Sequence, residues 1–290
     1  MKTIIVPLDF SNESIPSLDF AIFMANKSSA NILLVHVIKS YIANNEQLEK
    51  DRHWAIVKFE EIMRNYRDKL NSNLELSYRI KEGKIFREVT ELAKTFEDSM
   101  IILSTHGESG FEELFIGGNA YKIASHSSVP VITIRRSLTI TNIKKIVLPL
   151  DFTFETREKV PFTAELAKLF DSEIHLLAIR QVKLESMEQK IQEYIKQVAT
   201  YLEKQNISYT IENIQAHNLT DSTIEYANKI GADLISIMSE QEKKISNLLL
   251  GTYAHQMINQ SFIPVLIFPN YQILNLPDDI WDLGSFNDNN

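Results

Sequence analysis

The chain has 290 residues, which is long for one compact domain and sufficient for two domains of roughly 140 residues each. Its 44% hydrophobic and 23% charged residues are ordinary for a globular protein, and its formal net charge of −8 argues against binding to nucleic acid or to an anionic membrane. The absence of cysteine excludes disulfides, thiol catalysis and thiolate metal sites.

Apolar runs rich in Ile, Leu and Val predict strands in the first half near 3–8, 31–38, 74–80, 100–104 and 130–135. They are nearly continuous, as in parallel strands that are buried on both faces. Apolar residues recur at helical spacing over 55–70 and 85–96, and again over 187–202 in the second half. This alternation of strands and helices predicts an α/β fold with a doubly wound parallel sheet.

The second half of the chain repeats the first. Residues 4–11 read IIVPLDFS and residues 146–153 read IVLPLDFT, so that Asp9 aligns with Asp151 at an offset of 142 residues. Near the end of each half, the VPV at 129–131 aligns with the IPV at 263–265 at an offset of 134, so the second copy is shorter by about eight residues. Ordered matches with one consistent gap indicate a duplication. We predict domains over 1–138 and 143–270, followed by a polar tail over 271–290.

No apolar run approaches the roughly 18 residues that a membrane span needs. The apolar run over 3–8 is too short for the core of a signal peptide. We therefore expect a cytoplasmic protein with no nucleic acid and no membrane among its partners.

Two loops have the chemistry of a ligand site. Open α/β sheets bind ligands beyond the carboxyl ends of their strands, where the strand order reverses. One loop, 9–11, follows the first strand, and the other, 104–107, follows the fourth strand and leads to the glycines at 117–118. Glycines let the backbone approach a phosphate, and a helix N-terminus offers free N–H groups. In the alternative interpretation, Asp9 and Asp151 only cap a helix and the glycines only form turns.

These motifs resemble the universal stress protein family. The resemblance rests on the P-L-D-F-S start, the L-L-V-H-V strand, the S-T-H-G loop, a glycine separated from that loop by nine residues, and the final V-P-V strand. It covers residues 1–136 and 143–269. It implies two tandem five-stranded domains of the adenine nucleotide alpha hydrolase-like fold, each with strand order 3-2-1-4-5. It also implies ATP or AMP as the ligand of the N-terminal domain, with Mg²⁺ if the ligand is a triphosphate.

The resemblance assigns roles to individual positions. Asp9 and the backbone of Val37 would contact adenine, and the residues around ribose and phosphates would be Ser104, Gly107, Gly117, Gly118 and Asn119. Two of these depart from the family pattern, because Ser104 stands where a glycine belongs and Gly118 stands where a Ser or Thr would donate to a phosphate. A hydrogen bond to a charged group contributes roughly 1.5–3 kcal/mol, so its loss would weaken binding roughly tenfold or more.

The second half departs further from this pattern. It keeps Asp151, Gly251 and Thr252, but Met238 and Gln241 replace the two loop glycines. Side chains would then occupy the space that backbone and phosphate share, and the glutamates at 240 and 242 add charge of the wrong sign. We predict that this half does not bind ATP.

The last strand of each half, near 129–135 and 263–269, is apolar and would form an edge that invites aggregation unless it is covered. In the family that the chain resembles, these strands pair across a dimer interface. Because the duplication supplies both partners in one chain, we predict an intramolecular pseudo-dimer. Further association into a homodimer stays open.

Two functions of different classes stay open. The first is a stress-response protein that holds an adenine nucleotide and acts on an unknown protein partner rather than by turnover. The second is an interaction or regulatory module without nucleotide binding. Slow ATP hydrolysis or autophosphorylation is a further alternative, although the Walker A motif is absent. We assign no catalytic residue and no metal site, and we interpret His36 as a hydrogen-bonded core histidine.

Overall fold

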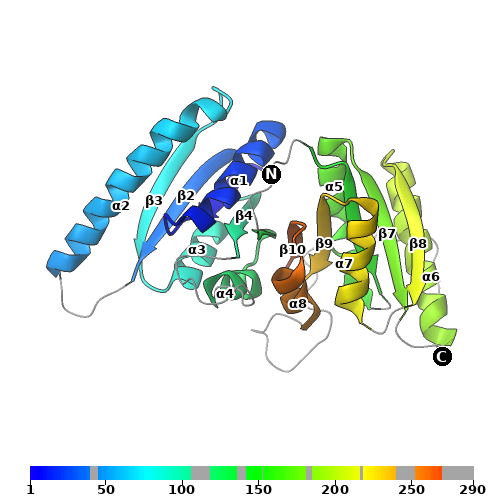
Figure 1. Ribbon diagram of the computed structural model, residues 1–290. Helices are drawn as coiled ribbons and strands as arrows, with labels where there is room; N and C mark the ends of the chain where they lie inside the picture. Colours follow the sequence, from blue (N-terminus) through cyan, green and yellow to red (C-terminus); the bar gives the residue numbers. More distant parts are fainter. Residues whose placement is uncertain are drawn as a thin grey trace.

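The computed structural model describes residues 1–39, 45–105, 118–135, 142–151, 153–180, 185–215, 218–239 and 252–269. In these ranges strands and helices alternate along the chain (Figure 1). The strands are β1 (Thr3–Pro7), β2 (Asn31–Ile38), β3 (Leu76–Glu82), β4 (Ser99–Ser104), β5 (Val131–Ile134), β6 (Lys145–Leu150), β7 (Glu173–Arg180), β8 (Tyr209–Gln215), β9 (Leu234–Met238) and β10 (Val265–Phe268). The helices are α1 (Ile15–Ser28), α2 (Asn45–Tyr66), α3 (Ile85–Lys94), α4 (Gly118–His126), α5 (Val160–Phe170), α6 (Glu185–Lys204), α7 (Leu219–Ile230) and α8 (Thr252–Gln260).

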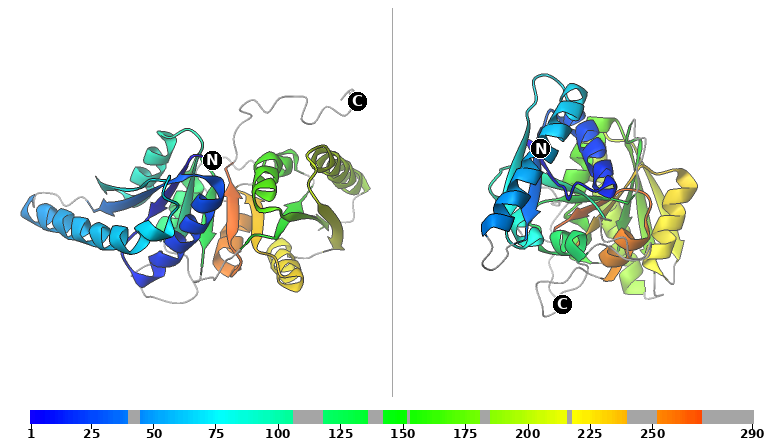
Figure 2. Two further views of the ribbon diagram at one scale, coloured as in Figure 1. Left: turned by 90° about the horizontal axis from the view of Figure 1, so that it is seen from above. Right: turned by 60° about the vertical axis from the view of Figure 1, so that its left-hand side comes forward.

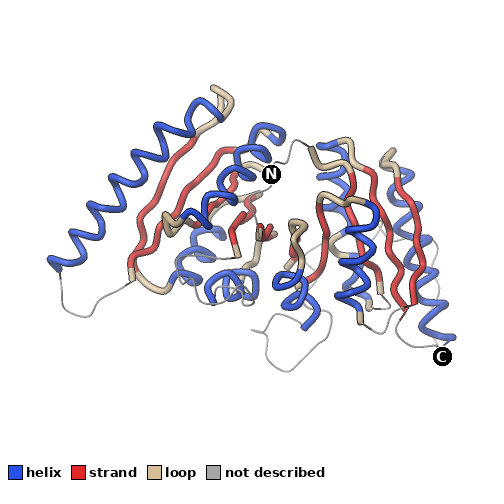
Figure 3. The backbone as a smooth tube through the Cα atoms, viewed as in Figure 1, coloured by secondary structure: helices blue, strands red, loops and turns tan. Residues whose placement is uncertain are grey.

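The strands form a single ten-stranded sheet in the order β3-β2-β1-β4-β5-β10-β9-β6-β7-β8 (Figure 3). Each half therefore has the order 3-2-1-4-5 that the family resemblance implies. Within each half the strand pairs are parallel. The predicted doubly wound α/β fold is confirmed, and the two five-stranded sheets are joined into one.

The two halves meet through antiparallel pairing of β5 with β10. Val265 pairs with Thr133, and Ile267 pairs with Val131, on either side of the central pair of Ile132 and Leu266. At the repeat offset of 134, each residue of β5 is equivalent to one of β10, so an exchange of the two halves leaves the register unchanged. The predicted pairing of the last strands is therefore confirmed, with the pseudo-two-fold axis at the central pair.

Helices cover both faces of the sheet (Figure 2). The helices α1, α2, α5 and α6 pack on one face over a core that continues from one half into the other. The helices α3, α4, α7 and α8 pack on the opposite face in two separate clusters. Successive strand residues alternate between these cores, as Ile4 and Ile5 of β1 do, because side chains of a strand point to opposite faces in turn.

The outermost strands differ from the sequence expectation that the strands are buried on both faces. Both β3 and β8 lie at an edge of the sheet, and most of their residues are partly or fully exposed. Edge strands with polar, exposed positions discourage pairing with another chain. No helix in the described ranges is long and apolar enough to span a membrane.

The pairing of the two halves can be tested at Ile132, which is fully buried in β5. We expect Ile132→Ala to lower the free energy of unfolding by about 2–5 kcal/mol, because the shortened side chain leaves a cavity beneath the paired strands. The matched control is Ile211→Ala on edge strand β8, where 43% of the isoleucine is exposed and the expected loss is about 0.5 kcal/mol. Urea denaturation followed by circular dichroism measures both, and equal losses would contradict the assignment.

Candidate functional site

The topology brings three of the predicted site residues to one edge of the sheet. The strand β1 lies between β2 and β4 and runs parallel to both, so the carboxyl ends of all three strands meet. Asp9 follows β1, Val37 lies near the end of β2, and Ser104 ends β4. Gly118 and Asn119 begin α4, which leads back to the amino end of β5, so its N-terminus lies toward the same edge. Gly107 and Gly117 lie outside the described residues.

Asp9 organises the turn after β1. Its Oδ1 accepts hydrogen bonds from the backbone N of Ser11 at 3.0 Å and from the Ser11 hydroxyl at 2.6 Å. The intervening Phe10 has a φ of 64°, in the left-handed region that bulky side chains seldom adopt. The second half repeats the turn, because Oδ1 of Asp151 accepts from the N of Thr153 at 2.8 Å and from its hydroxyl at 2.5 Å. The structural role of the aspartate is thus common to both halves.

The backbone of Val37 faces the space beyond β1. Leu8 donates its N–H to the carbonyl of Val35 at 2.8 Å, while Gly83 donates to the carbonyl of Ile38 on the other side of β2. Peptide groups along a strand alternate between the two neighbours. Val37, two residues beyond Val35, therefore presents its N–H and C=O toward β1, which ends at Pro7.

Ser104 contributes a polar atom that lacks a protein partner. Its Oγ is buried and has no hydrogen-bond partner in the described part of the chain. A buried hydroxyl usually finds a partner, so this atom marks a place where a ligand or water would bind. Gly118 and Asn119 are exposed at the start of α4, and a Cβ added to Gly118 would meet no heavy atom of the described residues within 4 Å.

The corresponding edge of the second half carries larger side chains. Ser17 of the first half is fully buried and donates its hydroxyl to the carbonyl of Ser14 at 2.6 Å. The equivalent residue, Lys159, is also buried, and its Nζ donates to the carbonyl of Thr156 at 2.6 Å. The lysine thus makes the same hydrogen bond as the serine but introduces a buried positive charge.

Two further replacements fill the same region. Met238, fully buried, stands at the position of Ser104. Tyr253, 8% exposed, stands at the position of Asn119 and shares a 3.0 Å hydrogen bond between its hydroxyl and that of Thr223. Side chains of the protein thereby replace the small polar groups of the first half.

The charged groups of this second edge have shifted pKa values. Burial lowers the pKa of Lys159 to about 8, although the carboxylates of Asp151 and Glu158 oppose the shift. Burial raises the pKa of Glu158 to about 7, with Glu155 adding to the shift and Lys159 opposing it. Burial also raises the pKa of Tyr253, and Asp151 adds to that shift. The negative charges of Asp151 and Glu158 thus favour the ammonium form of Lys159 against the effect of burial.

A family model for the universal stress protein family matches residues 1–135 and again residues 142–269. The chain belongs to the universal stress protein family. Among curated relatives, Universal stress protein MJ0531 of Methanocaldococcus jannaschii is 21% identical over 146 residues, which are 47% of this chain and 82% of that protein. Universal stress protein YxiE of Bacillus subtilis is 22% identical over 143 residues, which are 45% of this chain and 97% of that protein.

Solved structures of universal stress proteins share the two-domain architecture. One from Archaeoglobus fulgidus matches with a TM-score of 0.72 at 16% identity and covers 91% of this chain and 97% of its own. A putative universal stress protein of Pseudomonas aeruginosa matches with a TM-score of 0.68 at 16% identity and covers 97% and 95%. These likenesses show that the tandem arrangement of this universal stress protein is a fold that other chains adopt.

Sequence reasoning missed an aromatic cluster beside the site. The ring of Phe10 lies 4.6 Å from that of His36, 5.2 Å from that of Trp54 and 4.9 Å from that of Phe59. Trp54 precedes the apolar stripe of α2 by one position and is 45% exposed, so the helical pattern gave no reason to connect it with the loop after β1.

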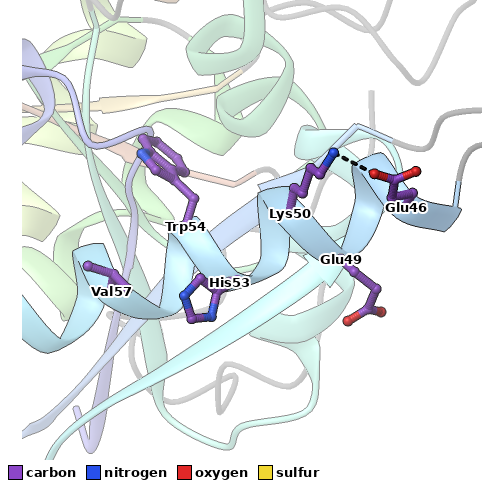
Figure 4. A pocket seen from close by; sticks show the side chains of 6 residues that line it. All are labelled: Glu46, Glu49, Lys50, His53, Trp54 and Val57. Carbon is purple, nitrogen blue, oxygen red and sulfur yellow. Dashed lines mark hydrogen bonds and ion pairs between the residues drawn. The ribbon is translucent and has the colours of Figure 1, made fainter.

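Trp54 also borders a groove on the outer side of α2. The residues that line this groove all come from one helix and are Glu46, Glu49, Lys50, His53, Trp54 and Val57 (Figure 4). Lys50 and Glu46 form a 2.6 Å ion pair between exposed side chains, which contributes little to stability. None of the residues that line the groove is one that the sequence assigned to a ligand.

The buried charge of Lys159 predicts a pH-dependent stability. The pKa of this lysine is lower in the folded chain, about 8, than in the unfolded chain, about 10.5. Between these values the unfolded chain binds the proton and the folded chain does not, so stability rises with pH. We expect the stability of the wild type relative to Lys159→Met to increase by up to about 1 kcal/mol per pH unit from pH 8 to pH 10.

Urea unfolding at several pH values measures this difference. Lys168→Met, which removes an exposed lysine of α5, the helix that Lys159 directly precedes, controls for the loss of a lysine as such. A difference between wild type and Lys159→Met that is constant over this range would show that the ammonium is not buried.

Proposed function

We propose that this universal stress protein binds one adenine nucleotide in its N-terminal half, and that it acts as a nucleotide-dependent binding protein in the cytoplasm rather than by turnover. The observation that carries the proposal is the contrast between the two halves at equivalent positions. Among the described residues, the buried hydroxyl of Ser104 in the first half has no hydrogen-bond partner, and it lies at the same edge of the sheet as the Asp9 turn. The second half fills the same places with Met238, Lys159 and Tyr253.

The polar groups at the first edge suit the rim of an adenine ring. Adenine offers an amino group and ring nitrogens, hence both donors and acceptors, along one edge. A carboxylate accepts a hydrogen bond, and the backbone of one strand residue supplies a donor and an acceptor. Asp9 and Val37 provide these groups, and the start of α4 supplies N–H groups and the positive end of a helix dipole for the phosphates, with Mg²⁺ if ATP is bound.

An interaction or regulatory module that binds no nucleotide is the second candidate. The large side chains at the second edge favour this candidate for that half, because the buried Met238, Lys159 and Tyr253 stand where the first half has smaller polar residues. In either case the chain would act by binding a protein partner that is not identified.

Calorimetric titration of the nucleotide-stripped chain with Mg-ATP tests the proposal. We expect one site per chain. Ser104→Met copies the second half, removes the hydroxyl and fills the space, so we expect it to weaken binding by more than tenfold. Met238→Leu, a change of similar volume in the second half, should leave binding unchanged. Two equivalent sites, or one site that survives Ser104→Met, would contradict the proposal, and no heat at millimolar ATP would favour the second candidate.

Gly118 allows an opposite test, in which binding is improved. Because no described residue lies within 4 Å of the Cβ position, Gly118→Ser adds a hydroxyl at the start of α4 without displacing any neighbour in the described ranges. A hydrogen bond from this hydroxyl to a phosphate contributes roughly 1.5 kcal/mol, so we expect ATP affinity to rise about tenfold. The matched control is Gly118→Ala, which adds only the methyl group. Equal affinities of the Ser and Ala variants would show that the phosphates do not reach this position.

A further inference from the structure

His36 connects the two segments that carry the adenine-facing groups. Its ring Nδ1 lies 2.8 Å from the carbonyl oxygen of Leu8. Leu8 directly precedes Asp9, and His36 directly precedes Val37. The side chain of His36 is thus hydrogen-bonded to the backbone just before Asp9, and His36 itself lies just before Val37. A second tie between the same segments is the 2.8 Å hydrogen bond from the N of Leu8 to the carbonyl of Val35.

The chemistry of this contact fixes the donor. A carbonyl oxygen only accepts hydrogen bonds, so Nδ1 of His36 carries the hydrogen. The ring also packs against two aromatic neighbours, since its centroid lies 4.6 Å from that of Phe10 and 6.0 Å from that of Trp54. The left-handed backbone of Phe10, with a φ of 64°, costs conformational energy that the surrounding contacts must offset. The turn that presents Asp9 is therefore supported from β2.

The second half lacks this support. At the repeat offset of 142, the residue equivalent to His36 is Ala178, which is fully buried and pairs with Leu150. The turn of Asp151 is instead held from the following segment, because the N of Asp151 donates to the hydroxyl of Thr156 at 3.3 Å. The histidine occurs in the half to which we assign the nucleotide and is absent from the half to which we assign none.

We propose that His36 is the positioning residue of the nucleotide site, which sets the separation between the Asp9 carboxylate and the backbone groups of Val37. This proposal rests on the proposed function, since it assigns the separation to the edge of an adenine ring. His36 itself does not touch the ligand. It acts through the carbonyl of Leu8, and its donor at Nδ1 is the feature on which the positioning depends.

Three variants of the full chain separate this role from general support of the fold. His36→Leu removes the donor and keeps a side chain of similar bulk. His36→Asn places an amide N–H near the position of Nδ1 and should still donate to Leu8. His53→Leu removes an exposed histidine of α2 and serves as the control. Calorimetry with Mg-ATP gives affinity, and amide hydrogen exchange of Leu8 and Ser11, compared with that of residues 99–104 in β4, reports on the turn.

We expect His36→Leu to weaken ATP binding at least tenfold and to accelerate exchange at Leu8 and Ser11 but not in β4. We expect His36→Asn to bind within about threefold of the wild type and His53→Leu to bind as the wild type does. Unchanged affinity in His36→Leu, or no rescue by His36→Asn, would overturn the proposal. Faster exchange in β4 as well as in the turn would also overturn it, because the histidine would then support the whole domain.

If the wild type binds no ATP, the proposed function fails, and the exchange measurements alone decide the role of His36. In that case local deprotection in His36→Leu that is reversed in His36→Asn supports the positioning role. The same rate of amide exchange at Leu8 and Ser11 in both variants contradicts this role.

Discussion

The antiparallel pairing of β5 with β10 is the constraint on which the rest of the structure depends. It joins two parallel sheets into one and removes from solvent the two strands that would otherwise be apolar edges. The remaining edges, β3 and β8, carry exposed and polar positions. Aromatic side chains also pack across the junction. The ring of Phe23 in α1 stacks on that of Phe170 in α5 with their centroids 5.3 Å apart. The ring of Tyr121 lies 5.1 Å from that of His255, the residue that is equivalent to it in the second half.

The same pairing separates the two candidate sites. Because β5 and β10 run in opposite directions, the carboxyl ends of the strands in the two halves point to opposite edges of the sheet. Each half therefore forms its own edge with its own residues. The turn of Asp9 and that of Asp151 share the same hydrogen bonds, so the backbone frame has been retained in both. The side chains around that frame have diverged.

The side chains at equivalent positions of the two edges differ in charge. In the first half, the residue equivalent to Lys159 is Ser17, which is small and neutral and donates its hydroxyl to the carbonyl of Ser14. In the second half, the buried ammonium of Lys159 supplies positive charge from within the protein. A buried lysine is costly unless an opposite charge lies nearby, and the carboxylates of Asp151 and Glu158 provide it. The second edge thus resembles a site whose ligand has been replaced by a side chain.

The amino-acid sequence by itself determined the duplication, the order of strands and helices, and the position of the Asp9 turn. These follow from local patterns, because apolar periodicity and loop composition depend on neighbours in the chain. Only the tertiary structure showed that His36 bonds to Leu8, that Phe10 packs against Trp54, and that Lys159 takes the place of Ser17. Those contacts join residues from different elements, or bury a charged side chain. They depend on strand register and on the burial of charge, and neither is encoded in any short stretch of sequence.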